Sequence, residues 1–375
     1  MLRSVEPVTH LLTGACLSRA LGLPSRVRYA TAACVLAAEL PDADYFYRLG
    51  GPLLYFQHHR GWTHALWSLP LQAALVTGLF YYLHQTRHIW KKHRSVDEPA
   101  PTNWRALFVI ALMGLLSHIA LDWTNNYGVR PFAPFVSKWY AGELFFIVEP
   151  ILLGSLVLAL LLPLLLSLVH REIGIRRPRY PGSVLAILPL LVIAGMLIKS
   201  MLGHMDAEAL AQAQQLRGGA ILRSSESPYP NTSSQWHAVL ETPLSMQMGT
   251  MNLGAGVAGT GLFDTNPQET YPKIADTPFV TAAKASWLGR IYLDWSKFPR
   301  VVDAGAAIHV HPDMELTAEQ GAMHVVRFSD LRFKYDTLFM KGASGESPLG
   351  AEAWVDSNLH VRRVFMMGAE QRISR

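Results

Sequence analysis

Long runs without charged residues alternate with short polar segments over the first 200 residues. The four longest are residues 66–83, 106–121, 145–169 and 180–198, which hold 18, 16, 25 and 19 residues. Only Glu149 interrupts the third, and the second lengthens when it is extended back to Trp104. Because roughly 17–25 apolar residues in a helix cross the hydrocarbon layer of a bilayer, the pattern predicts four transmembrane helices.

Two shorter apolar segments come first, at residues 8–23 and 27–40. A turn at residues 22–25, with the sequence Gly-Leu-Pro-Ser, would fold them into an antiparallel hairpin. Both segments are rich in Gly, Ala, Ser and Cys, and small residues let helices approach closely in lipid. A hairpin returns to its starting side, so His10 at its beginning should lie near Asp42 and Asp44 after its end.

The pattern changes near residue 205. Residues 207–216 are typical of a short polar helix, and β-type stretches follow at residues 220–223, 236–241, 287–295, 306–310, 324–328 and 359–366. Clusters of Gly, Pro, Ser and Asn separate them. The predicted fold is an α-helical polytopic membrane domain, with an N-terminal hairpin and four transmembrane helices, over residues 1–204. A small, mainly antiparallel β soluble domain follows over residues 205–375.

Charge separates the two faces of the membrane. The chain is 50% hydrophobic and 16% charged, and its 33 basic residues exceed its 28 acidic ones. Much of the excess lies at the hairpin tip and in the loops near residues 87–105 and 171–179, which the positive-inside rule places in the cytoplasm. The histidine and aspartate loops and the C-terminal domain then face outward. The charge excess therefore reflects topology; it predicts membrane lipids as partners and no nucleic acid, and the sequence names no protein partner.

Several residues at the predicted outward face are metal-ligand types. His118 and Asp122 lie four apart, hence on one helical face, where an imidazole and a carboxylate can share an ion. Residues 58–64 contain three histidines, including His59 and His64, just before a predicted span. A polar helix end and an interfacial anchor are the respective structural alternatives.

Asp42 and Asp44 come directly after the predicted hairpin, where a plain helix stop is the alternative. His10 begins the first hairpin segment. Together with the histidines above, these residues suit zinc, manganese or iron at one or two sites. Such a centre would activate water against an ester or phosphoester, and Arg60 could neutralise the charge that develops on the substrate.

These motifs resemble those of the YdjM-type family of bacterial inner-membrane proteins, which are regarded as metal-dependent hydrolases. The resemblance rests on residues 7–14, 40–44, 59–64, 118–122 and 127–128 and covers about residues 1–200. It implies a bacterial inner-membrane protein and a hydrolase. The family pattern also leads us to expect an aspartate near residues 146–150, where this chain has Glu149, a carboxylate that would act as ligand or base.

Two functions follow from these observations. The first is a metal-dependent hydrolase at the membrane–water interface, acting on a phosphoester or a lipid-derived substrate. The second is a non-catalytic membrane protein with a structural metal site and a β domain that binds a partner. A catalytic site keeps an open coordination position, whereas a structural site is closed.

Overall fold

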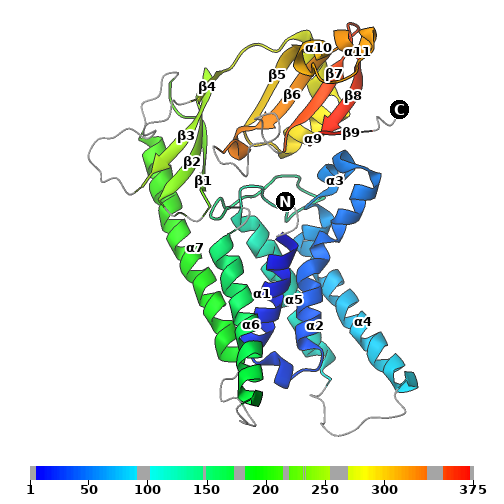
Figure 1. Cartoon of the computed structure of the whole chain (residues 1–375), viewed down its shortest axis with the longest axis vertical. Coiled ribbons are helices and arrows are strands. Elements are labelled where there is room, and N and C mark those ends of the chain that lie inside the picture. The colour runs from blue at the N-terminus through cyan, green and yellow to red at the C-terminus, as the bar shows by residue number, and fades with distance from the viewer. Residues whose placement is uncertain are drawn as a thin grey trace. The chain divides into compact units, whose positions relative to one another are not determined.

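A computed structural model describes residues 6–90, 102–146, 149–172, 182–213, 219–230, 232, 234–253, 269–335 and 349–371 (Figure 1). The chain forms two compact units. The first holds Met1–Asp44, Arg60–His204 and Pro228–Ser233, and the second holds Tyr45–His59, Met205–Ser227 and Ser234–Arg375. The expected domain boundary between residues 204 and 205 stays a prediction.

The first unit begins with the expected helical hairpin. Helix α1 (Glu6–Ala20) leads through the short helix η2 (Leu23–Ser25) into α2 (Ala30–Glu39). The chain reverses at Gly22, whose φ of 63° lies in the left-handed region that glycine adopts without strain. A Cβ atom on Gly14 would lie only 2.9 Å from the Cys34 carbonyl oxygen, so the two helices approach as closely as the small residues predict.

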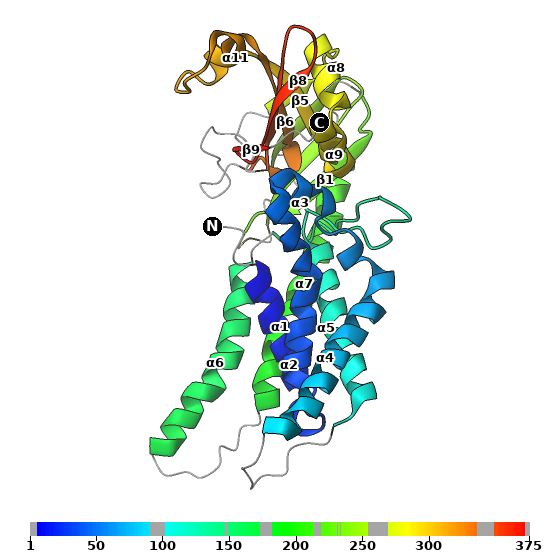
Figure 2. The same ribbon diagram turned by 90° about the vertical axis from the view of Figure 1, so that its right-hand side faces the viewer.

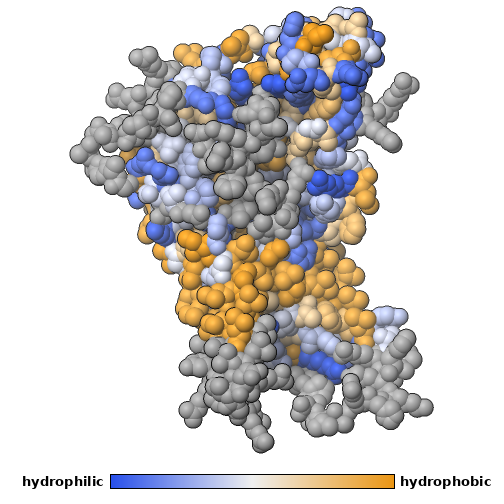
Figure 3. Space-filling view, in the orientation of Figure 1, coloured by the Kyte–Doolittle hydropathy of each residue, from blue (hydrophilic) through white to orange (hydrophobic). Residues whose placement is uncertain are grey.

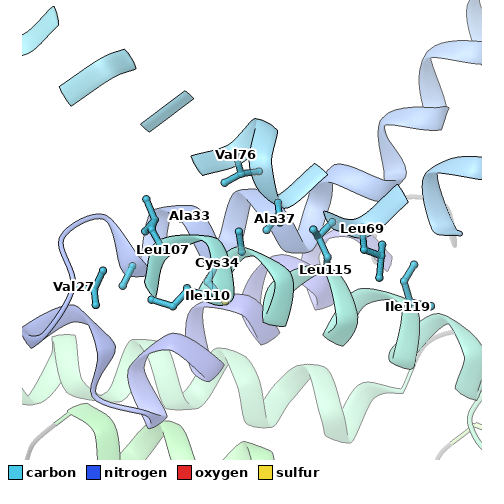
Figure 4. Close-up of a cluster of buried hydrophobic side chains, with 13 residues drawn as sticks. Val27, Ala33, Cys34, Ala37, Leu69, Val76, Leu107, Ile110, Leu115 and Ile119 are labelled. Atoms are coloured by element: carbon cyan, nitrogen blue, oxygen red, sulfur yellow. The ribbon is translucent and has the colours of Figure 1, made fainter. Parts of the chain in front are cut away.

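Helices α4 (Leu69–Trp90) and α5 (Trp104–Thr124) pack against α2. Buried side chains from the three helices and Val27, which precedes α2, form one apolar cluster, seen in Figure 4. Its helical members are Ala30, Ala33, Cys34, Ala37, Leu69, Ala73, Val76, Leu107, Ile110, Ala111, Leu115 and Ile119. At Gly114 of α5 a Cβ atom would lie 2.6 Å from the Cys34 carbonyl oxygen. This close crossing fixes the position of α5 against α2.

Helix α6 (Pro150–Glu172) and the part of α7 (Gly182–Gln212) up to His204 complete the first unit (Figure 2). Within the described part of the chain, three helices are long and apolar enough to cross a membrane: Leu66–Thr86, Trp104–Thr124 and Leu185–Gln212. Pro150–Pro163 is a shorter apolar helix, so four spans remain a prediction. Figure 3 shows hydrophobic side chains gathered over the lower parts of these helices, as lipid exposure requires.

The second unit contains two sheets. Strands β1 (Arg223–Pro228), β2 (Gln235–Glu241), β3 (Ser245–Asn252) and β4 (Glu269–Pro272) form one in that order, with antiparallel pairing from β2 to β4. The other sheet is an antiparallel meander of β5 (Pro299–Ala306), β6 (His324–Asp330), β7 (Ala351–Val355), β8 (Val361–Met366) and β9 (Ala369–Gln371). The predicted antiparallel β character is confirmed.

Short helices accompany these sheets, namely α8 (Pro278–Ala285), α9 (Trp287–Trp295), α10 (Ala307–Val310), α11 (Ala318–Ala322) and η6 (Leu331–Phe333). Two of them correct strand predictions. Residues 287–295 are helical because Ser286 caps the helix by accepting the Gly289 N–H, and Leu288, Tyr292 and Trp295 share one buried face.

Residues 307–310 form α10, so only Ala306 of the predicted strand at 306–310 belongs to a strand. The polar helix expected at residues 207–216 is also different from the prediction. Residues 207–212 are the continuation of α7, since no proline separates them from the apolar segment and the single Gly203 is tolerated within the helix.

Residues 45–59 belong to the second unit although the chain on both sides of them belongs to the first. They contain most of η3 (Leu40–Gly50) and all of α3 (Pro52–His58). The Leu53 N–H donates to Gln371 Oε1 at 3.0 Å, and the Phe56 ring lies 4.9 Å from that of Trp295. Nothing in the hydropathy pattern predicts that residues 45–59 belong to the second unit, because these contacts are made with residues far away in the sequence.

Candidate metal centre

Four of the predicted ligands converge at one end of the helices of the first unit. Asp42 comes from η3, His64 from η4 (Trp62–His64), and His118 and Asp122 from α5. One donor atom from each lies within 4.8 Å of all the others. His64, His118 and Asp122 are buried, whereas the side chain of Asp42 is 25% exposed.

The spacing of the donor atoms fits a tetrahedral ion. His64 Nε2 lies 3.2 Å from His118 Nε2, and Asp122 Oδ2 lies 3.2 and 3.3 Å from these two nitrogens. Asp42 Oδ1 is 3.6 Å from each nitrogen. Ligand atoms bound tetrahedrally to zinc at about 2.0–2.1 Å lie about 3.3 Å apart, so these five separations are already close to the required value.

Hydrogen bonds to the far side of each imidazole turn the Nε2 atoms toward this point. His118 Nδ1 lies 2.6 Å from the Ala38 carbonyl oxygen, which can only accept, so Nδ1 carries the proton and Nε2 keeps its lone pair. His64 Nδ1 lies 3.0 Å from Thr63 Oγ1 and 3.5 Å from Asp44 Oδ2. Partners of this kind orient histidine ligands in metal sites.

Two further observations fit a cation. Asp122 Oδ2 is buried and receives no hydrogen bond from the described residues, which is costly for a carboxylate oxygen unless an ion satisfies it. Burial by itself lowers the pKa of His64, but the nearby carboxylates of Asp122, Asp42 and Asp44 outweigh this effect and raise that pKa to about 9. The carboxylates therefore favour a positive charge at this point, whether a proton or a metal ion.

Asp44 lies behind the four donor atoms. Its Oδ2 accepts the Arg60 backbone N–H at 2.8 Å and lies 3.5 Å from the Thr63 hydroxyl, which donates to it. Asp44 therefore fixes the loop that carries His64, and in this geometry it supports a ligand. Direct ligation by Asp44 stays a prediction.

Arg60 is buried, and its guanidinium group is held by the end of α5 and the turn that follows. Nη2 donates to Asp122 Oδ1 at 2.8 Å, and Nη1 donates to Asn125 Oδ1 at 3.2 Å and to the Gly128 carbonyl at 3.1 Å. The guanidinium also lies 5.0 Å from the Tyr127 ring centroid. Arg60 thus orients the Asp122 carboxylate, and its expected action on a substrate stays a prediction.

His10 and Glu149 border a cavity next to one of the four donor residues, Asp122. Its volume is about 40 Å³, and Asp122, Phe145 and Leu152 also line it. His10 Nε2 lies 3.3 Å from Asp122 Oδ1, and its Nδ1 finds no hydrogen-bond partner among the described residues. Since one water needs about 10–15 Å³ of such volume, the cavity has room for about three.

His59 lies elsewhere. It belongs to the second unit, where its ring is 4.6 Å from that of Tyr55. The group of converging donors among the described residues does not include it. Helix α3 ends at His58, and His59 has the non-helical angles φ −57° and ψ 135°. Ligation by His59 stays a prediction.

Comparison with known proteins shows to which family the chain belongs. The family model described as "YdjM inner membrane protein" matches residues 5–203, which is more than half of the chain. The chain belongs to the YdjM inner membrane protein family. All the site residues named above lie within the matched part, whereas nearly all of the second unit follows it.

Among curated proteins, the chain is similar to the "Uncharacterized protein YfhP" of Bacillus subtilis (strain 168). It is 28% identical over 145 residues, which is 36% of this chain and 38% of YfhP. The chain thus aligns with less than two fifths of that relative. No solved structure matches the chain.

Some residues of this YdjM-family site were not predicted from the sequence. Asn125 Oδ1 accepts from Arg60 Nη1 and from the Tyr127 and Gly128 N–H groups, and Gln72 Nε2 donates to the Thr63 carbonyl at 2.7 Å. The Asn-Asn-Tyr-Gly sequence after α5 does signal a turn, which could have suggested Asn125. A backbone carbonyl such as that of Ala38 has no sequence signal at all.

Proposed function

We propose that this protein is a membrane-bound hydrolase that depends on a divalent metal, most simply zinc, and acts on a phosphoester at the membrane–water interface. One observation carries the proposal. Three of the four donor atoms are buried, whereas the fourth belongs to the partly exposed Asp42, whose place on the ion could be taken by water. Asp122 and Glu149 line a neighbouring cavity. Two imidazoles and two carboxylates suit zinc, and manganese or iron are the alternatives.

A bound divalent ion would lower the pKa of a water molecule and polarise a phosphoryl oxygen. The residues of the chain supply the remaining functions. Glu149, held by the Phe146 N–H at 3.2 Å, is the group we assign to accept a proton in the cavity that it lines. Arg60 keeps Asp122 in one orientation, and the apolar wall formed by Phe145 and Leu152 limits access of bulk water.

The alternative is a structural metal site in a protein whose β domain binds a partner. Ligation of the ion by all four donors at once would favour it, since a structural site has no open coordination position. The exposed quarter of Asp42 and the neighbouring cavity favour the catalytic proposal.

The Glu149→Gln variant distinguishes a catalytic from a structural metal site. As the proton acceptor, Glu149 should contribute about 10²–10⁴-fold, so turnover of an aryl phosphodiester by the zinc-loaded Gln variant should fall by about that factor. Metal content, measured by elemental analysis, should stay near that of the wild type. Glu149→Asp is the matched control and should recover part of the activity. Equal turnover by the wild type and the Gln variant would remove Glu149 from the mechanism.

We also propose that the metal centre and the C-terminal domain face the periplasm, on the basis of the alternating basic loops. Alkaline phosphatase, which is active only outside the cytoplasm, should be active when fused after residue 375. Green fluorescent protein at the same point, exported in unfolded form, should stay dark. The opposite pair of results would place both the domain and the metal centre in the cytoplasm.

A further inference from the structure

We propose that an exposed apolar surface beside the metal centre is immersed in the headgroup layer of an anionic phospholipid leaflet. We call this surface the aromatic rim; it consists of Trp62, Leu66, Trp67, Phe132, Phe135 and Val136. Each of these residues is more than 40% exposed, and Phe135 is 80% exposed. Contiguous apolar exposure of this kind marks a surface that contacts a membrane or another protein.

Hydrogen bonds fix the conformation of the aromatic rim. The Leu66 N–H donates to the Pro131 carbonyl at 2.9 Å, and Trp67 Nε1 donates to the Ala133 carbonyl at 2.6 Å. Paired backbone bonds between Val129 and Tyr140, both 2.9 Å, close the loop that presents Phe132, Phe135 and Val136. These bonds hold the apolar side chains outward. Figure 2 shows the teal loop after α5 projecting to the side of the helices.

The position of the rim relative to the bilayer follows from its bonds to a span. Leu66 is the first residue of the candidate span Leu66–Thr86, and the loop is tied to Leu66 and to Trp67 beside it. The rim therefore lies where that helix would leave the hydrocarbon. Tryptophan is enriched at this level because its ring is apolar and its N–H is polar.

Two basic residues in the same loop indicate which kind of membrane surface the aromatic rim contacts. The exposed Lys138 lies in the same loop, with its ammonium 5.3 Å from the Tyr140 ring centroid, and the guanidinium of Arg130 lies 4.6 Å from that of Trp139. Cations beside interfacial aromatic rings are attracted to anionic headgroups. An anionic leaflet satisfies both the apolar and the basic parts of the rim, and the inference holds whether or not the metal centre is catalytic.

Fluorescent labelling tests this. The full-length protein with Phe135→Cys, labelled with a polarity-sensitive dye, is placed in nanodiscs of phosphatidylethanolamine and phosphatidylglycerol. Cys16 and Cys34 are buried and should label little. Lipids that carry a nitroxide at the headgroup should quench the Phe135→Cys label severalfold more than a label at Asn358→Cys, which lies in the turn between β7 and β8. Iodide in the buffer should quench the two labels in the reverse order.

Three results would overturn the proposal. Strong iodide quenching at Phe135→Cys with no effect of the nitroxide lipid would leave the rim in water. Quenching by neither reagent would mean that a protein surface covers the rim. Unchanged nitroxide quenching in neutral phosphatidylcholine and in the Lys138→Gln variant would remove the preference for anionic lipid, whereas a severalfold decrease in both is expected.

Discussion

Replacing His118 with alanine should remove most of the bound divalent metal from the purified protein. Loss of a supporting residue around a metal site already lowers affinity about 10–100-fold, and a direct ligand should matter more. His118 contributes Nε2 to the donor group, and its Nδ1 bond to the Ala38 carbonyl sets the orientation of the ring. Elemental analysis after dialysis against a weak chelator should show close to one ion per chain in the wild type and little in the variant.

His309→Ala is the matched control. His309 is an exposed histidine of α10 in the second unit, so its loss should leave the metal content unchanged. If the His118→Ala and His309→Ala proteins retained the same amount of metal as the wild type, the four converging residues would not form a metal centre.

Gly114→Ala should destabilise the first unit and weaken metal binding together, although alanine is normally the better helix former. The new Cβ atom would meet the Cys34 carbonyl oxygen at 2.6 Å and the Ala37 Cβ at 3.1 Å, and backbone atoms cannot move aside cheaply. Overpacking of this kind costs about 1–3 kcal/mol. Because His118 lies one turn after Gly114 and bonds to Ala38, separating α2 from α5 would also disturb the ligand.

The measurement is thermal unfolding of the detergent-solubilised protein together with metal content. Gly78→Ala in α4 is the control, since a Cβ atom there meets nothing within 4 Å, and it should be neutral or slightly stabilising. A Gly114→Ala protein as stable and as rich in metal as the Gly78→Ala protein would mean that the close crossing of α2 and α5 does not position the centre.

Much of the metal centre could be anticipated because its geometry is encoded locally. His118 and Asp122 are one helical turn apart, the hairpin ends at Asp42, and His64 directly precedes a span, so simple topology brings these residues to one end of the helices. The bonds that orient them could not be anticipated. The roles of the Ala38 carbonyl and of Asn125 depend on which backbone atoms face one another after folding.

The second unit was predicted less completely. Stretches of β type between turn-forming clusters identified β2 and β6, which are both largely buried. Residues 287–295 contain enough aromatic and branched side chains to resemble a strand. They form a helix because the Ser286 side chain caps its N-terminus. The placement of residues 45–59 in the second unit has no local signal. That segment joins Asp44 to Arg60, so it links the two units covalently at the metal centre.

The most direct test of the central proposal is hydrolysis of an aryl phosphodiester by full-length protein in nanodiscs. The wild type should release the phenol, lose this activity after chelation, and regain it when zinc or manganese is returned. His64→Ala, which removes one of the converging nitrogens, should release no more phenol than empty nanodiscs under any of these conditions. Equal release by the wild type and by His64→Ala, across phosphoesters and carboxyl esters alike, would contradict the hydrolase and favour a structural metal site.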